Sequence, residues 1–165
     1  MTTIAYDGRI IAADGLRLWG SDIVSTSEQK IRPLYIGEPS SKRLYALAGY
    51  AGLTSAFPAI ELWYLEGAQF GAAPKVEIEG WDALFVGKGR SAELATSAMQ
   101  GVVRIAPPIA IGAGGELAIG AMLAGASAYD AVQLICERTN HSGGKVWAYD
   151  VGQSMAAGKL IDHVS

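Results

Sequence analysis

The chain has only one cysteine, two histidines and few charged residues. Among 165 residues there are 16 acidic and 13 basic side chains, giving a formal net charge of −3. A single cysteine forms no internal disulfide, and Cys136, His141 and His163 lack the spacing of a zinc site. Without an excess of basic residues the chain is poorly suited to bind nucleic acid or an anionic membrane surface. We therefore expect no metal, cofactor or nucleic-acid partner.

Long hydrophobic runs are also missing. Glycine, proline or a charged residue interrupts each apolar stretch before it reaches the eighteen or so residues that predict a membrane span. The segment Met1–Ile4 has neither the charged nor the apolar region of a signal peptide. Hydrophobic residues nevertheless make up 50% of the chain, which favours a compact core. We expect one soluble, cytoplasmic domain covering residues 1–165.

The first half of the chain has the pattern of strands. Thr2–Tyr6 and Arg9–Ala13 are short apolar runs around Asp7-Gly8, a typical hairpin turn. Further strands are predicted at Lys30–Ile36 and Arg43–Gly49, and in the second half at Trp81–Val86, Ile109–Ile111 and Lys145–Val151.

Helical periodicity appears in three segments. Leu53–Ala68 is predicted as a helix that Thr54 or Ser55 caps, with Pro58 in its first turn. Two more helices are predicted at Glu116–Leu123 and at Ser127–Thr139, the latter capped by Ser127 and Asp130. Gly152–Ser165 is left unassigned. This order of elements predicts an α+β fold in which two sheets stack face to face with helical layers outside.

Common catalytic and nucleotide-binding motifs are not present. Gly120 and Gly125 have the spacing of a phosphate-binding loop, but Ala126 and Ser127 stand where its lysine is needed. Gly112-Ala113-Gly114-Gly115 lacks the remaining glycine of a dinucleotide fingerprint, and there is no Gly-x-Ser-x-Gly elbow.

Thr2 is the remaining candidate nucleophile. It follows an initiator methionine of the kind that is generally removed before a small residue, and removal of Met1 would leave threonine at the N-terminus. An N-terminal threonine carries both a hydroxyl nucleophile and an α-amine that titrates near 7.7–8.0 and acts as base. Such a site also needs a cation beside the hydroxyl and a backbone N–H for the oxyanion.

Several short strings, in order and spread over most of the chain, carry a family resemblance. They are Thr2-Thr3-Ile4, Ala13-Asp14-Gly15, Lys30-Ile31-Arg32, Ala48-Gly49-Tyr50-Ala51-Gly52, Ile109-Ala110-Ile111-Gly112 and Thr139-Asn140-His141. With these strings the chain resembles the N-terminal nucleophile hydrolases of the proteasome β-subunit family, and is most similar to the bacterial HslV-type peptidases. The resemblance implies a four-layer αββα sandwich of two mainly antiparallel sheets.

The resemblance also implies residue roles. Thr2 would be the nucleophile, Lys30 the cation beside its hydroxyl, and Asp14 the carboxylate that holds Lys30 charged. Gly49 would donate the oxyanion N–H. Leu47 would form the floor of an apolar pocket for the acyl-side residue of the substrate.

Two positions depart from the family pattern. Ala113 replaces the serine whose hydroxyl helps to organise the nucleophile's amine. Thr139 stands where proteasomal subunits have an aspartate before Ser142-Gly143-Gly144. Loss of one such hydrogen bond costs about 0.5–1.5 kcal/mol, which slows a reaction more readily than it abolishes it.

By resemblance the chain is expected to be a threonine endopeptidase that works inside stacked hexameric or heptameric homo-oligomeric rings. Its substrates would be peptides or unfolded proteins, and an unfolding ATPase is a possible partner. The alternative is a weakly active or inactive ring subunit with a scaffold role, because retention of Met1 converts the α-amine of Thr2 into an amide.

Overall fold

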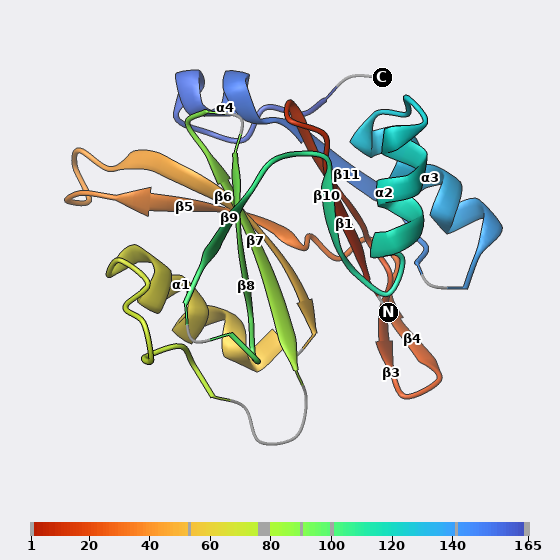
Figure 1. Cartoon of the computed structure of the whole chain (residues 1–165), viewed down its shortest axis with the longest axis horizontal. Helices are drawn as coiled ribbons and strands as arrows, with labels where there is room; N and C mark the ends of the chain where they lie inside the picture. The colour runs from red at the N-terminus through yellow and green to blue at the C-terminus, as the bar shows by residue number, and fades with distance from the viewer. Residues whose placement is uncertain are drawn as a thin grey trace.

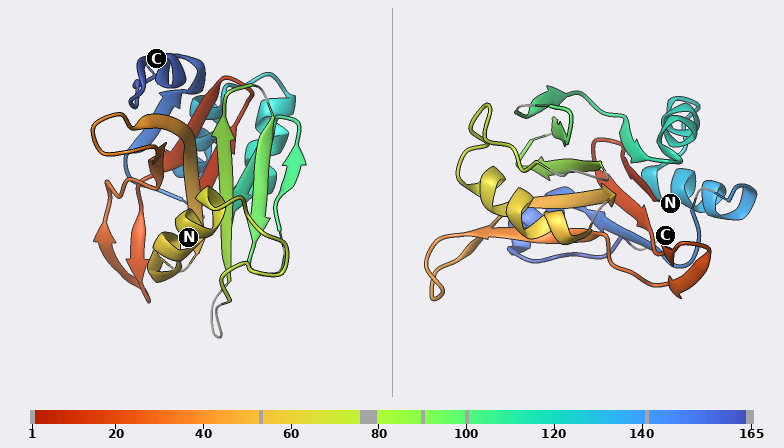
Figure 2. Two further views of the ribbon diagram at one scale, coloured as in Figure 1. Left: turned by 90° about the vertical axis from the view of Figure 1, so that its left-hand side faces the viewer. Right: turned by 90° about the horizontal axis from the view of Figure 1, so that it is seen from below.

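The computed structural model describes residues 2–52, 54–75, 80–89, 91–99, 101–140 and 142–163. Strands and helices both contribute to the fold, and the strands pair antiparallel throughout the described sheets. The predicted α+β class is therefore confirmed. Figure 1 shows the arrangement of these elements, and Figure 2 shows it from two further sides.

One sheet has four strands in the order β10, β1, β2, β11. These strands are β1 (Thr3–Tyr6), β2 (Ile10–Asp14), β10 (Ile109–Gly112) and β11 (Val146–Asp150). The predicted turn between β1 and β2 is confirmed, because Asp7 Oδ1 accepts the Arg9 and Ile10 N–H groups at 2.8 and 2.7 Å. Gly8 has a φ of 101°, a conformation that side chains disfavour.

The second sheet has five strands in chain order. They are β5 (Ile31–Ile36), β6 (Arg43–Gly52), β7 (Trp81–Gly87), β8 (Ala92–Thr96) and β9 (Val103–Ile105). A separate hairpin of β3 (Arg17–Trp19) and β4 (Asp22–Ser25) leaves the body of the protein after β2 and projects at the lower right of Figure 1. The sequence did not predict β3, β4, β8 or β9.

The helices are α1 (Phe57–Leu65), α2 (Gly115–Leu123), α3 (Ala128–Arg138) and α4 (Val151–Ala157). Ser127 caps α3 as predicted, since its Oγ accepts the Asp130 N–H at 3.1 Å. The predicted cap of α1 is wrong. Thr54 and Ser55 lie in a 3₁₀ turn, and the N-cap residue is Ala56, which makes no side-chain cap. Pro58 does lie in the first turn, where its missing N–H costs nothing.

Three groups of buried side chains connect these elements. Residues from both sheets, including Ile4, Ile11, Leu47 and Leu84, form one cluster. Ala12 of β2 packs with Val132 and Ile135 of α3, while Tyr50 and Phe85 of the five-stranded sheet pack with Ile60 and Trp63 of α1. Alternate residues of one strand thus face different clusters, which is the two-residue period expected of a strand. None of the described helices is long and apolar enough to cross a membrane.

Adjacent positions on α3 provide a test of the cluster that it covers. Ile135 is 2% exposed, whereas Leu134 is 48% exposed. Ile135→Ala is expected to lower the free energy of unfolding by about 2–5 kcal/mol because it leaves a cavity. Leu134→Ala is the matched control and should change that free energy by less than about 0.5 kcal/mol. The two values come from urea denaturation, and equal losses would contradict this packing.

Candidate functional site

A buried ion pair lies beside the N-terminal strand. Lys30 Nζ is 2.9 Å from Asp14 Oδ1, and the two side chains are 8% and 0% exposed. Asp14 is the last residue of β2, and Lys30 directly precedes β5. The ion pair therefore connects one sheet to the other.

The same lysine also reaches the predicted nucleophile. Lys30 Nζ donates a hydrogen bond of 3.0 Å to Thr2 Oγ1. Burial lowers the pKa of the Lys30 ammonium below its usual value, while the Asp14 carboxylate opposes that shift. The structure thus brings together the three residues that the sequence predicted to form a cluster.

Backbone amides complete the shell around Asp14. Its Oδ1 accepts the Thr3 N–H at 2.8 Å, and its Oδ2 accepts the N–H groups of Leu16 and Gly143, each at 3.3 Å. The carboxylate is therefore held in a fixed orientation towards Lys30.

Thr3 and Ser142 were not predicted as part of this cluster. The Thr3 hydroxyl is hydrogen-bonded to the Ser142 hydroxyl, and both residues are buried. The string Ser142-Gly143-Gly144 is visible in the sequence, but nothing in it indicates contact with residues near position 3. Thr139, which departs from the family pattern, is the C-cap residue of α3, and its Oγ1 donates to the Ile135 carbonyl at 2.9 Å. His141 lies outside the described residues.

Gly112 and Gly114 let the end of β10 and the residues after it lie close to Thr2 and Thr3. A Cβ on Gly112 would collide with the Thr2 carbonyl, and one on Gly114 would collide with the Thr3 hydroxyl. Gly112 also has a φ of 86°, which a residue with a side chain adopts only with strain. The segment after β10 therefore fixes where Thr2 lies.

Thr2 borders two hollows on the surface. One, of about 320 Å³, is also lined by Lys30, Arg17, Arg32 and Phe57. The other, of about 520 Å³, includes Ala113 beside Thr2. We call the first of these the Thr2 hollow.

Gly49 and Leu47 are not brought to these hollows. Gly49 lies within β6, paired with Ile31 on one side and Leu84 on the other, so its N–H lies in the plane of a paired strand. Leu47 is completely buried in the cluster between the sheets. Their oxyanion and pocket roles stay predictions. Three other β6 residues do border the hollows. Tyr50 lines the Thr2 hollow, Ala51 lines the second hollow, and Gly52 lines both.

Metal-binding groups are not found in the described part of the chain, where no three His, Cys, Asp or Glu side chains gather. Cys136 lies near enough to the ion pair to interact with it electrostatically, and burial raises the pKa of its thiol to about 11. A thiol with that pKa is protonated at neutral pH and is a poor nucleophile.

Comparisons with known proteins give a structural match. No family model and no curated protein matches the chain. A solved structure, Thiobacillus denitrificans BPH, is similar to it with a TM-score of 0.58 and 22% identity, over 91% of this chain and 97% of that chain. At this identity the likeness shows a shared fold.

The Asp14–Lys30 pair can be tested by removing one charge or both. Asp14→Asn leaves a buried ammonium without a counter-ion, and we expect it to lower the free energy of unfolding by about 3–5 kcal/mol. Adding Lys30→Met removes the unpaired charge and should restore part of that loss. Chemical denaturation of the two variants measures both effects. If the double variant were less stable than Asp14→Asn alone, the buried ammonium would not be the source of the loss.

Proposed function

We propose that the chain is a threonine peptidase whose nucleophile is Thr2 after removal of Met1. The observation that carries the proposal is the hydrogen bond of 3.0 Å from Lys30 Nζ to Thr2 Oγ1, because it places a buried cation on the hydroxyl that would attack. We further propose that the packed sheets and helices form the four-layer sandwich of the N-terminal nucleophile hydrolases. The strings of sequence described above support this assignment.

The proposed reaction has two acyl-transfer steps. Thr2 Oγ1 attacks the peptide carbonyl while the freed α-amine accepts the hydroxyl proton, and the ammonium of Lys30 stabilises the developing negative charge on Oγ1. The C–N bond breaks as the leaving amine takes up a proton, and an ester on Thr2 remains. Water then attacks the ester, releases the acyl group as a carboxylic acid and returns the proton to the hydroxyl.

Homo-oligomeric rings are part of the proposal. Leu117 and Leu123 on α2 are 52% and 71% exposed. Exposed apolar side chains such as these would lose contact with water where another protein packs against the helix. A second copy of the chain is the proposed partner, and an unfolding ATPase could supply substrate to the resulting chamber.

A scaffold role is the second candidate function. Ala113 lies beside Thr2 and carries no hydroxyl that could orient an amine. A chain that keeps Met1 has an amide in place of the base. In that case the same fold would serve as a ring subunit with little or no activity.

Intact mass spectrometry with a peptide epoxyketone separates these candidates, because this reagent needs both the hydroxyl and the free amine of an N-terminal threonine. We expect loss of Met1 and a single adduct in the natively expressed protein. Thr2→Ala should give no adduct and no peptide cleavage. Ser41→Ala, which removes an exposed hydroxyl before β6 and away from the hollows at Thr2, should react like the unchanged protein. Retained Met1 without an adduct would support the scaffold role.

The Thr2 hollow also predicts which residue is preferred on the acyl side of the cleaved bond. Its lining includes Arg17 and Arg32, whose carboxylate partners Glu28 and Glu61 lie 3.3 and 3.5 Å away. Lys30, Arg17 and Arg32 outnumber Glu28, the acidic residue among the described lining residues, so we propose a preference for an acidic residue. The apolar preference that the resemblance implies for Leu47 is the alternative outcome.

Fluorogenic peptides that differ only in this acyl-side residue test the preference. The unchanged protein should have a higher kcat/KM for glutamate than for leucine, and Arg32→Leu should reverse the order by removing a positive charge and adding apolar surface. Arg138→Leu, on α3, is the control for loss of charge elsewhere. Faster cleavage after leucine by the unchanged protein would contradict the assignment.

A further inference from the structure

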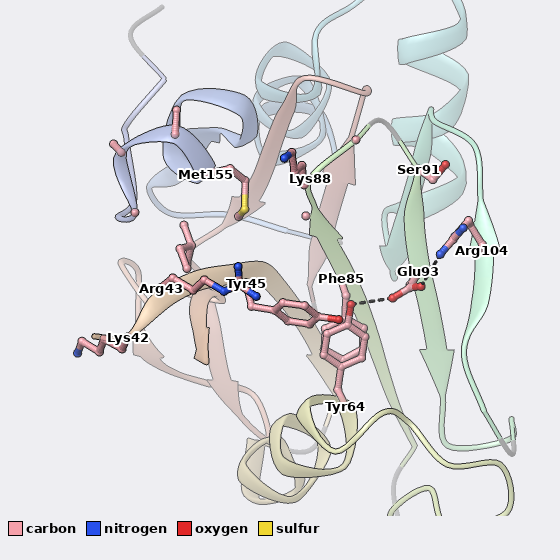
Figure 3. Close-up of a pocket in the computed structure, with 16 residues that line it drawn as sticks. Lys42, Arg43, Tyr45, Tyr64, Phe85, Lys88, Ser91, Glu93, Arg104 and Met155 are labelled. Atoms are coloured by element: carbon pink, nitrogen blue, oxygen red, sulfur yellow. Dashed lines mark hydrogen bonds and ion pairs between the residues drawn. The ribbon is translucent and has the colours of Figure 1, made fainter. Parts of the chain in front are cut away.

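A third hollow lies at the opposite end of the five-stranded sheet from Thr2. Its lining includes Arg43 and Tyr45 of β6, Lys88 after β7, and Glu93 and Arg104 of β8 and β9. The second of the two hollows that Thr2 borders lies at the other ends of β6 and β7, at Gly52 and Trp81. The seven-residue separation of Tyr45 and Gly52 along β6 corresponds to about 23 Å. We call this cavity of about 780 Å³ the distal hollow (Figure 3).

The charge of the distal hollow is opposite in sign to that of the chain. Glu93 is the only acidic residue among the described residues of its lining, and both of its oxygens are engaged. Oε1 is 3.3 Å from the Arg104 guanidinium, and Oε2 accepts the Tyr64 hydroxyl at 2.7 Å. Arg43 and Lys88 are exposed and have no carboxylate within salt-bridge distance in the described part of the chain. Lys42, also exposed in the lining, has its ammonium over the Tyr35 ring at 4.9 Å. Arg43 and Lys88 are therefore the two lining cations that neither a carboxylate nor an aromatic ring engages among the described residues.

Aromatic rings lie beside these cations. Tyr64 stacks on Phe85 with ring centroids 3.7 Å apart, and Tyr45 approaches Tyr64 at 6.0 Å. Tyr45 is 46% exposed, so part of its ring is free to contact a ligand. Figure 3 shows Tyr45 between Arg43 and Phe85, with Lys88 reached from the turn after β7.

An irregularity in the sheet sets the position of Tyr45. Tyr35 pairs with Leu44 and Leu34 pairs with Ala46, so Tyr45 is the extra residue of a β-bulge. A bulge changes the direction of a side chain and is frequent beside binding sites. On the other side of β6, Gly87 pairs with Ala46, and a Cβ on this glycine would be 3.0 Å from the Tyr45 carbonyl. The backbone is thus adapted to this arrangement.

We propose that the distal hollow binds a nucleoside polyphosphate. An aromatic face suits a base, and the cations of Arg43 and Lys88 in the same lining suit the phosphate chain, since a guanidinium and an ammonium are both strong donors to phosphate oxygens. The volume lies within the range of small-molecule sites. The proposal does not rest on peptidase activity, because none of these residues borders Thr2.

Isothermal titration calorimetry without divalent cations tests the site on the full chain, with ATP, sodium tripolyphosphate and adenosine as separate probes. We expect ATP to bind most tightly, tripolyphosphate more weakly and adenosine not at all at millimolar concentration. Absence of ATP binding at millimolar concentration would overturn the proposal. Equal affinity for ATP and tripolyphosphate would overturn the role of the base.

Variants assign the binding to these residues. The double variant Arg43→Ala with Lys88→Ala should weaken ATP at least tenfold, whereas Arg138→Ala with Lys75→Ala, which removes the same charge at exposed positions elsewhere, should leave the affinity within twofold. Tyr45→Leu should weaken ATP and leave tripolyphosphate unchanged. Equal losses in the two double variants would indicate attraction by net charge alone and would overturn the site. Circular dichroism of each variant checks that it is folded.

Discussion

The arrangement of the N-terminal strand depends on the carboxylate of Asp14. Its two oxygens accept hydrogen bonds from Lys30, Thr3, Leu16 and Gly143, so one buried group joins the start of β1, the end of β2, the residue before β5 and the turn before β11. A carboxylate without exposure to water is stable in ionised form only when such partners surround it. The position of Thr2 beside Lys30 follows from this network, because Thr3 is held by its backbone N–H.

Close packing of backbone against the strand adds a second constraint. The Thr2 carbonyl and the Thr3 hydroxyl occupy the space that side chains would need at Gly112 and Gly114. The electrostatic network fixes the strand from the side of β2, and the glycines fix it from the side of β10. The place of the Thr2 hydroxyl is thus set by this backbone packing and by the hydrogen bond from Lys30 Nζ.

Much of the fold is predictable from local patterns. The buried strands β1, β2, β5, β6, β7, β10 and β11 each carry a continuous or alternating apolar run that the sequence shows. The strands that were missed are β3 and β4, which are largely exposed, and β8 and β9, in which polar residues interrupt a short pattern. α4 has only seven residues, too few for a helical period to be evident. Burial, which produces the pattern, is what makes a strand predictable.

The candidate site was predictable only in part, because its members come from distant parts of the chain. The family resemblance named Thr2, Asp14 and Lys30, and the structure places them together. It gave no sign that Ser142 contacts Thr3, since pairing across 139 positions leaves no local signal. Likewise, only the register of β6 shows that Gly49 is paired on both sides and that Tyr45 bulges. β6 borders the Thr2 hollow at one end and the distal hollow at the other. Because this strand is paired on both sides between them, it keeps the lining residues of the two hollows apart.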